Sequence, residues 1–382
     1  MQSQHTPILI IGGGIAGLTM AIGLQQNGID ALIAEAAPEF KPVGAGLVLA
    51  ANAMKAYQVL GLEKKIAEAG NALNEIDILD HKGKSITSTD LGSIGDGTPN
   101  VAIHRAALHQ VLLKELKAEN ILNGFRSQKI SQVGNQYQVT FENGHSITCD
   151  HLISAEGIHA IVRDWAFPGS KLRYSGYTCW RGIAEKADGV ALDKATETWG
   201  PSGRFGIVPV GDGKVYWFAV KNGPENSEEL RSYSKEDLIN TFSDYHAPIP
   251  ALIRDTNPDT IIFNDIIDLK PIPRFAKDNL VLIGDAAHAT TPNMGQGACQ
   301  AIEDAVILAD CIKNGRTVAR AFTDFERRRL KRTHQIVNRS WTLGKIGQLE
   351  NPALINLRNL LLRSMPPSIN RKNIEKIYDF KI

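Results

Sequence analysis

The stretch PILIIGGGIAGLTMAIGLQQNGIDALIAE, residues 7–35, decides how the chain is expected to fold. Ile8–Ile11 form a short apolar run of the kind found in strands that are buried on both faces. Glycines at 12–17, a helical pattern and a second apolar run ending at Glu35 follow. This order, with an acid about 20 residues after the glycines, predicts a dinucleotide-binding βαβ unit.

The glycine-rich turn has the G-x-G-x-x-G spacing, and each position has a physical reason. Gly12 permits the tight turn, Gly14 lets backbone N–H groups approach a pyrophosphate, and Gly17 allows the helix to pack closely on the strand. Ile15 and Ala16 begin the helix, whose N-terminus offers partial positive charge to phosphates. A turn without a ligand is the alternative, and the turn does not separate NAD from FAD.

The stretch LVLIGDAAHATTPNMGQGACQAIEDA, residues 280–305, indicates a second ligand-binding segment. Its apolar start predicts another buried strand, and Gly284 and Asp285 follow at the carboxyl end, where open α/β sheets bind ligands. We expect Asp285 to accept hydrogen bonds from a sugar or ribityl hydroxyl group. Pro292 and the triplet Gly295-Gln296-Gly297 then precede a predicted helix.

The N-terminus of that helix favours negative charge, such as the charge on the N1–C2=O edge of a reduced flavin. The segment has no evident nucleophile with a base. This fits a cofactor that carries the chemistry itself.

Three pieces of the chain, GGGIAG, ISAEGIHAIVR and LIGDAAHATTPNMGQG, resemble in order the signatures of the single-component FAD-dependent aromatic hydroxylases of the para-hydroxybenzoate hydroxylase type. The resemblance covers about residues 7–330. YSGYTCWRGI and PNMGQGACQAIEDA are also similar to bacterial urate hydroxylases and plant zeaxanthin epoxidases. The resemblance implies an α/β fold, α+β overall, with a Rossmann-like FAD-binding domain, a mostly antiparallel substrate domain and C-terminal helices.

The resemblance also implies a function. Bound FAD, reduced by NAD(P)H as a transient co-substrate, would take up O2 as a flavin C4a-hydroperoxide and hydroxylate or epoxidise a small cyclic or aromatic substrate. In keeping with this, we find no second strand–GxGxxG–helix unit for NAD(P)H. An FAD-dependent reductase or dehydrogenase and a non-enzymatic flavin sensor are the alternatives.

Several cofactor contacts are implied by the resemblance alone. Glu35 would hold the adenosine ribose, Arg105 would contact the FAD, and Asp285 would hold its ribityl–pyrophosphate part. Pro292 would lie beside the reactive face of the flavin, with Gly295–Gly297 around the pyrimidine end.

The middle signature departs from the family pattern. Glu156 stands where Asp is usual and Ala160 where Ser is usual, while Arg163 is kept. Glu156 preserves the carboxylate, so we expect it to remain part of the FAD site.

A hairpin in the middle of the chain supplies the catalytic candidates. RFGIVPV (204–210) and KVYWFAV (214–220) flank a Gly-Asp-Gly turn. With Val210 opposite Lys214, the two-residue period places Arg204, Val208, Tyr216 and Phe218 on one face and Phe205, Ile207, Val215 and Trp217 on the other.

In the urate-hydroxylase branch, an Arg and a Tyr in matching positions are implied to bind and activate the substrate together with an acid. Arg204, Tyr216 and Pro292 are therefore the catalytic candidates, and a solvated sheet face is the alternative. The position of the acid is Asn293 here. A neutral amide cannot act as a general base, so urate is not the expected substrate.

The domain organisation is expected to be discontinuous. Short strands with turns are predicted over residues 128–153. The expected parts are an FAD-binding domain at 1–71, 100–170 and 272–330, a substrate-binding domain at 72–99 and 171–271, and a C-terminal helical segment at 331–382. The basic run at 327–335 predicts a solvated face. The apolar periodicity at 351–367 predicts a helix that packs on the body, with contact between subunits or with a membrane as alternatives.

Composition restricts the partners. With 382 residues and a net charge of +1, nothing suggests nucleic acid as a partner. The four cysteines are scattered, so neither disulfides nor a metal site are expected. No apolar run reaches the roughly 18 residues that span a bilayer, and no signal peptide is evident. We expect a cytoplasmic monomer or homodimer without integral membrane association.

Overall fold

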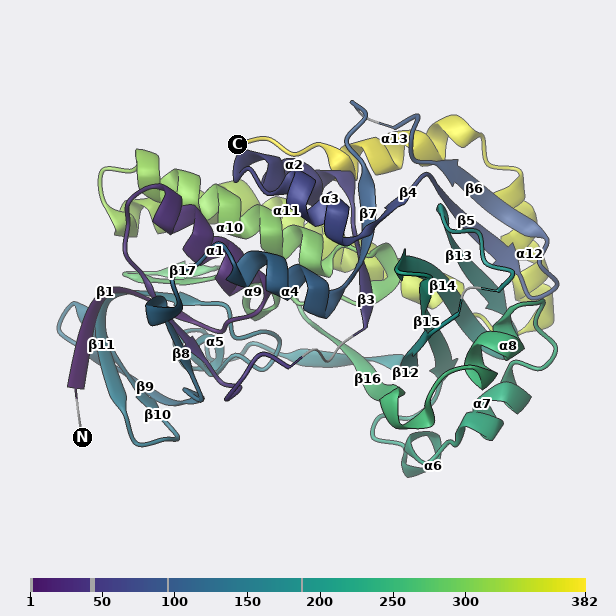
Figure 1. Cartoon of the computed structure of the whole chain (residues 1–382), viewed down its shortest axis with the longest axis horizontal. Coiled ribbons are helices and arrows are strands. Elements are labelled where there is room, and N and C mark those ends of the chain that lie inside the picture. Colours follow the sequence, from purple (N-terminus) through teal and green to yellow (C-terminus); the bar gives the residue numbers. More distant parts are fainter. Residues whose placement is uncertain (1–2, 42–44, 95, 187) are drawn as a thin grey trace.

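The computed structural model describes residues 3–41, 45–94, 96–186 and 188–382. Figure 1 shows two sheets side by side, with helices packed above the sheet that contains the N-terminus. The long helix α11 (Val318–Gly347) contacts the first sheet and ends beside the second. The α/β architecture, α+β overall, agrees with the sequence prediction.

The first sheet carries the dinucleotide-binding unit. Strands in the order β18-β11-β1-β2-β8 are parallel, and β10 and β9 continue from β11 as an antiparallel meander. Ile8–Ile11 are at most 3% exposed, as expected for a central parallel strand. Its eight strands are β1 (Ser3–Ile11), β2 (Leu32–Glu35), β8 (Ile121–Asn123), β9 (Ser127–Val133), β10 (Gln136–Phe141), β11 (Ser146–Ser154), β17 (Ala276–Lys277) and β18 (Leu280–Leu282).

Helices cover this sheet and bury its apolar residues. Helix α1 crosses α10 so closely that a methyl group added at Gly23 would lie 2.8 Å from Cβ of Ala309. The helices are α1 (Ile15–Gln26), α2 (Ala51–Val59), α3 (Glu63–Ala69), α4 (Arg105–Leu113), η1 (Ala118–Asn120), α5 (Ile161–Ala166), α9 (Asp285–His288), η3 (Pro292–Met294) and α10 (Gly297–Asn314). A small sheet of β3 (Gly46–Leu49), β7 (Asn100–His104) and β4 (Asn71–Leu73) lies beside them.

The second sheet has seven strands and is antiparallel except between β13 and β5. One face packs on three short helices through a core that contains Trp180, Phe205 and Trp217. The strands are β16 (Ile262–Leu269), β12 (Leu172–Ala184), β15 (Lys214–Asn222), β14 (Gly203–Gly211), β13 (Lys194–Gly200), β5 (Glu75–Asp80) and β6 (Ser85–Asp90), and the helices are α6 (Glu228–Arg231), α7 (Lys235–Thr241), α8 (Ile249–Arg254) and the short η2 (Pro258–Thr260).

The surroundings of the basic run in α11 differ from the sequence prediction. Arg329, expected on a solvated face, is 1% exposed and donates to Glu303 and Asp304 of α10. Arg332 also donates to Glu303. The solvated-face prediction is wrong for these two arginines because α10 supplies buried carboxylates that pair with them. Helix α11 also passes residue 330, the expected domain boundary, without interruption.

The last two helices are α12 (Pro352–Arg363) and α13 (Pro367–Tyr378), and α12 differs from a second sequence prediction. Leu354, Leu357, Leu360 and Leu361 are 49–65% exposed, so the packing predicted for 351–367 is wrong for this stripe. The inward face of α12 carries Arg358, whose guanidinium lies over the Trp199 ring. Apolar periodicity gives a helix a face but does not say what covers it.

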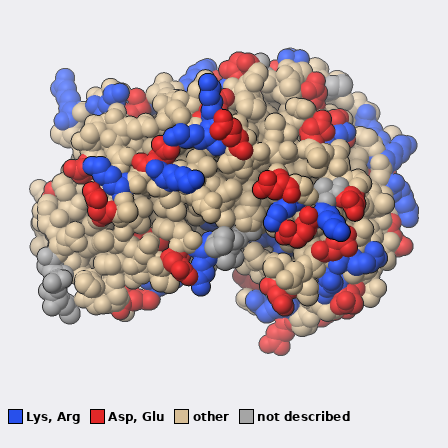
Figure 2. Space-filling model, viewed as in Figure 1, with Lys and Arg blue, Asp and Glu red and all other residues tan. Residues whose placement is uncertain are grey.

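The surface shown in Figure 2 has basic and acidic side chains interspersed, as the small net charge implies. Among the described residues, none of the helices combines the length and apolar character needed to cross a bilayer.

Candidate active site

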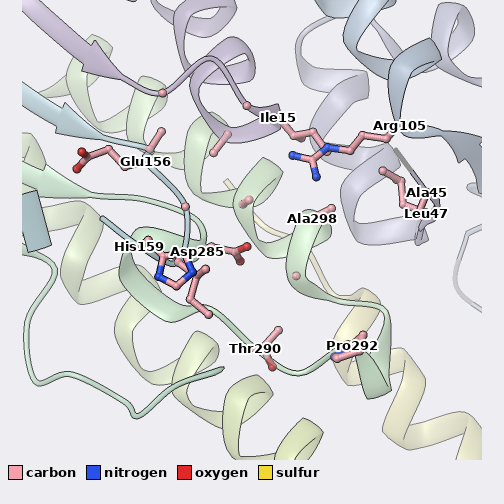
Figure 3. A pocket seen from close by; sticks show the side chains of 18 of the residues that line it. Ile15, Ala45, Leu47, Arg105, Glu156, His159, Asp285, Thr290, Pro292 and Ala298 are labelled. Atoms are coloured by element: carbon pink, nitrogen blue, oxygen red, sulfur yellow. The ribbon is translucent and has the colours of Figure 1, made fainter. Parts of the chain in front are cut away.

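A cavity of about 1140 Å³ lies between the two sheets. It begins at the carboxyl ends of β1, β2 and β11 and reaches the inner face of the second sheet. Because sites for small ligands usually measure about 300–1,000 Å³, this volume has room for a dinucleotide together with a second, smaller molecule. Figure 3 shows Arg105, Asp285 and Pro292 along this space.

The glycine loop forms one wall and keeps it open. Gly12 has φ +102°, and a methyl group there would lie 2.3 Å from the Ala155 carbonyl oxygen. At Gly17 a methyl group would lie 1.9 Å from the Gly12 carbonyl oxygen, so this glycine lets α1 pack on the turn. A methyl group at Gly14 would meet no described atom within 4 Å, which leaves the backbone there open to a ligand.

Glu35 ends β2 beside this loop. Its carboxylate accepts hydrogen bonds from the backbone N–H groups of Gly13, at 2.6 Å, and Ala37, at 2.7 Å. The carboxylate therefore stabilises the loop while lining the cavity with Ile15 and Ala16.

Arg105 and Asp285 reach into the cavity from opposite sides (Figure 3). Neither side chain makes a hydrogen bond to any residue that the structure describes. Burial raises the pKa of Asp285, and the nearby His288 and Arg105 only partly oppose this effect. A carboxylate and a cation that both face the cavity without partners among the described residues suit the ribityl hydroxyl groups and the pyrophosphate of FAD. Together with the open backbone at Gly14, they fit the cofactor.

Glu156 lines the cavity but directs its carboxylate away from Asp285 (Figure 3). The carboxylate accepts from the Ser127 hydroxyl at 2.6 Å, the Ser154 hydroxyl at 3.0 Å and the Val162 N–H at 3.1 Å. Burial raises its pKa although these donors oppose the rise. The side chain is engaged in holding the start of α5, so any contact with FAD is left to the backbone here.

The segment from Gly284 to Gly297 divides between the cavity and the interior. Pro292, Gly295 and Gly297 line the cavity. The Gln296 side chain instead accepts from Asn52 at 3.0 Å and from Gln300 at 2.9 Å, and it is 2% exposed. Gly17, Gly284 and Gln296 make their contacts within the protein, with Gly12, with Asp304 and with Asn52 and Gln300 respectively, and their place at the cofactor stays a prediction.

A buried ionic network fixes this segment from behind. Asp304 accepts from the Gly284 N–H at 2.9 Å and pairs with His288 at 2.6 Å and Arg329 at 2.6 Å. Burial alone would raise the pKa of Asp304, but His288 and Arg329 hold it below the ordinary value. His288 thus has a structural role in this network. No group of His, Cys, Asp and Glu suited to a metal occurs among the described residues.

The second sheet closes the other end of the cavity. Val208 pairs with Tyr216 and Arg204 with Val220, the register predicted from the hairpin. A bulge between Pro209 and Gly211 makes Gly211, not Val210, the partner of Lys214. The predicted faces are confirmed, because Arg204, Val208, Tyr216 and Phe218 line the cavity, whereas Phe205, Ile207, Val215 and Trp217 lie in the core.

Arg204 lies at the cavity wall, and each nitrogen of its guanidinium donates to a protein acceptor. It donates to Gln348 at 3.0 Å, Glu197 at 3.0 Å and Asn293 at 2.7 Å, and it is 2% exposed. It therefore ties the second sheet to the segment after Pro292 and to the end of α11.

Asn293 is equally occupied. Its Nδ2 lies 2.8 Å from the Tyr177 hydroxyl, the Thr291 hydroxyl and the Ser340 carbonyl oxygen, and its Oδ1 accepts from Arg204. Tyr216 differs, because its phenol makes no hydrogen bond to a described residue. Burial raises the Tyr216 pKa, so the phenol stays protonated and donates at neutral pH.

Sequence reasoning missed Arg181 of β12, which also lines the cavity. Its Nη2 donates to Oδ1 of Asn264, whereas its buried Nε has no partner among the described residues. The alternation along β12 would have shown that Arg181 and Cys179 share a face, but not which face meets the cavity.

The fold and the cavity define a flavoprotein that binds FAD between a Rossmann-like unit and an antiparallel sheet. The chain belongs to the FAD binding domain family, which matches residues 5–340.

Its relatives include an aurachin C monooxygenase/isomerase of Stigmatella aurantiaca, 38% identical over 360 residues and 94% of each chain. Another is a 2-heptyl-3-hydroxy-4(1H)-quinolone synthase of Pseudomonas aeruginosa, 33% identical over 97% of each chain. The crystal structure of Klebsiella pneumoniae HpxO with FAD and uric acid superposes with a TM-score of 0.90, at 28% identity over 98% of this chain and 96% of that one.

The resemblance to FAD-dependent aromatic hydroxylases is thereby confirmed. The chain is an FAD-dependent monooxygenase that acts on a small aromatic substrate, and use of NAD(P)H and O2 is consistent with its family. The names of the relatives favour oxygen insertion over the reductase and sensor alternatives.

Proposed function

We propose that this monooxygenase hydroxylates a two-ring heteroaromatic of the 4(1H)-quinolone type that carries an alkyl chain. The observation that carries this substrate class is the substrate end of the cavity, where apolar side chains line much of the wall and the Glu197 carboxylate is paired with Arg204. Its wall is formed by Val208, Phe218, Val220, Ile262 and Ile266. The quinolone synthase of Pseudomonas aeruginosa, similar over 97% of this chain, supports the same class.

The hydrogen bonds of Asn293 bear on which substrates can react in this cavity. Substrates that react only after losing a proton need a general base, and neither Asn293 nor Arg204 offers one. A 4(1H)-quinolone needs no such base, because its ring nitrogen already makes C3 electron-rich. Urate is therefore not proposed, although HpxO was crystallised with uric acid.

In this proposal the two ends of the cavity have separate tasks. Uptake of electrons from NAD(P)H and activation of O2 are the chemistry that FAD supplies when bound. Gly12, Gly14, Glu35, Arg105 and Asp285 hold the cofactor.

At the opposite end, Tyr216 donates to the substrate and Pro292 borders the reacting space. The apolar strands exclude water there. Arg204 acts mainly through Asn293 and is assigned as a positioning residue.

The test is turnover under 18O2 with 2-heptyl-4(1H)-quinolone and NADH or NADPH. We expect a 3-hydroxy product that carries one labelled oxygen atom, and NAD(P)H oxidation that accelerates when the quinolone is added. Product without label would contradict oxygen insertion. Turnover of urate but not of the quinolone would overturn the substrate class. A cytoplasmic location stays a prediction. The oligomeric state, a monomer or a homodimer, is also a prediction, and light scattering would measure it.

A further inference from the structure

The substrate end of the cavity contains two hydrogen-bond donors that lack acceptors. One is Nε of Arg181, which is buried without a partner among the described residues. The other is the phenol of Tyr216, which makes no hydrogen bond to a described residue. Buried donors are nearly always paired in folded proteins, so an unpaired one calls for an explanation.

Strand register brings these donors to one place. Arg181 of β12 lies opposite Phe218 of β15, and Ile183 lies opposite Tyr216. Arg181 and Tyr216 are therefore diagonal neighbours on the same sheet face, within reach of long side chains. Both line the cavity.

The positive charge of Arg181 also lacks a negatively charged partner among the described residues. Its one side-chain partner is the neutral amide of Asn264, and no carboxylate lies within 4.0 Å of it among the described residues. Arg204, the other arginine of this wall, is paired with Glu197, and each of its guanidinium nitrogens already has a protein partner. The guanidinium of Arg181 therefore remains without a carboxylate partner among the described residues.

We propose that Arg181 and Tyr216 form a subsite for an oxygen atom on the substrate ring, either an oxo group or an ionised hydroxyl group. This inference rests on the proposed function, since it concerns the same cavity, and it adds which ring substituent is recognised. The apolar wall accepts the rings, and the two donors fix the ring by its oxygen. A ring that lacks the oxygen would leave both donors unpaired and is rejected.

The experiment compares 2-heptyl-4(1H)-quinolone with 2-heptylquinoline, which lacks this oxygen and also the hydrogen on the ring nitrogen. The variants described next assign the preference to the oxygen. Each is titrated into the FAD-bound protein without NAD(P)H, and binding is followed by the change in flavin absorbance. We expect the wild-type protein to bind the quinolone at least about tenfold more tightly. In Arg181→Met the preference falls below about threefold, through weaker quinolone binding, and Arg181→Lys restores part of it.

Tyr216→Phe provides an independent variant, because it removes only the hydroxyl group. We expect it to reduce the preference about three- to tenfold with an unchanged melting temperature. Equal binding of both ligands by the wild-type protein, or an undiminished preference in Arg181→Met and Tyr216→Phe, overturns the subsite while 18O incorporation would still support the proposed function. If the wild-type protein binds neither ligand, the substrate class and the subsite fall together.

Discussion

The two ends of the cavity use their polar side chains in opposite ways. At the glycine-loop end, Arg105 and Asp285 project into the space without a hydrogen bond to a described residue. At the sheet end, Arg204 and Asn293 bind each other and the surrounding protein through almost every polar group that they have.

This difference separates ligand binding from positioning. A side chain kept for a ligand leaves its charge or hydrogen-bonding groups unpaired in the protein, and the protein tolerates the resulting loss of stability. A positioning side chain contributes to stability, because removing it leaves its partners unpaired. Substitutions at the two ends should therefore separate into those that weaken ligand binding and those that unfold the protein.

The largest effect is expected where the glycine loop touches the protein. Gly12→Ala places a methyl group 2.3 Å from a backbone oxygen in a left-handed conformation, which should destabilise the apoprotein by about 3–5 kcal/mol. Gly14→Ala is the matched control, since its methyl group meets no described atom and φ is −74°.

For Gly14→Ala we expect an unchanged apoprotein melting temperature and at least about tenfold weaker FAD binding. Urea unfolding and flavin fluorescence titration measure the two quantities. Equal loss of stability in both variants would show that the loop is structural throughout.

The two arginines give the next comparison. Arg204→Met leaves Glu197, Asn293 and Gln348 without their donor, which should lower the free energy of unfolding by about 2–4 kcal/mol. Arg105→Met should change it by less than about 0.5 kcal/mol but weaken FAD binding about tenfold or more. Thermal unfolding with and without FAD distinguishes the two, and a stability loss in Arg105→Met would contradict the division between the two ends.

The cofactor end was predictable because backbone geometry there depends on local sequence. Gly12 is required by its own φ and by contact with Ala155, and such requirements recur wherever the turn occurs. The spacing to Glu35 also indicates where β2 ends. The hairpin faces followed equally from the period of two residues.

Other parts depend on contacts between distant segments. Nothing in the run around Arg329 shows that Glu303 and Asp304 lie opposite it, since those acids come from another helix. The engagement of Arg204 needs Gln348, 144 residues away. Likewise, the leucines of α12 have regular spacing but no covering element among the described residues. The pattern of a sequence predicts which residues share a face of a helix or strand. Which residues they contact depends on the tertiary fold.

At Asp285 a small effect on stability is expected, and it has the opposite sign. Burial raises the Asp285 pKa in the apoprotein, so ionisation of this carboxyl group opposes folding above the raised pKa and has no effect below its ordinary pKa of about 4. Asp285→Asn should therefore make the apoprotein more stable at neutral pH. The gain stays below about 1 kcal/mol, because the carboxylate is accessible from the cavity and water screens it.

This gain should shrink as the pH falls towards about 4, while FAD binding at neutral pH weakens about tenfold. Urea unfolding of both apoproteins across this pH range, with FAD titrations alongside, measures the opposed effects. If Asp285→Asn loses stability at every pH, the carboxylate supports the fold and is not reserved for a ligand. A gain in stability joined to a loss of FAD affinity is the signature of a side chain that the protein keeps unpaired for its cofactor.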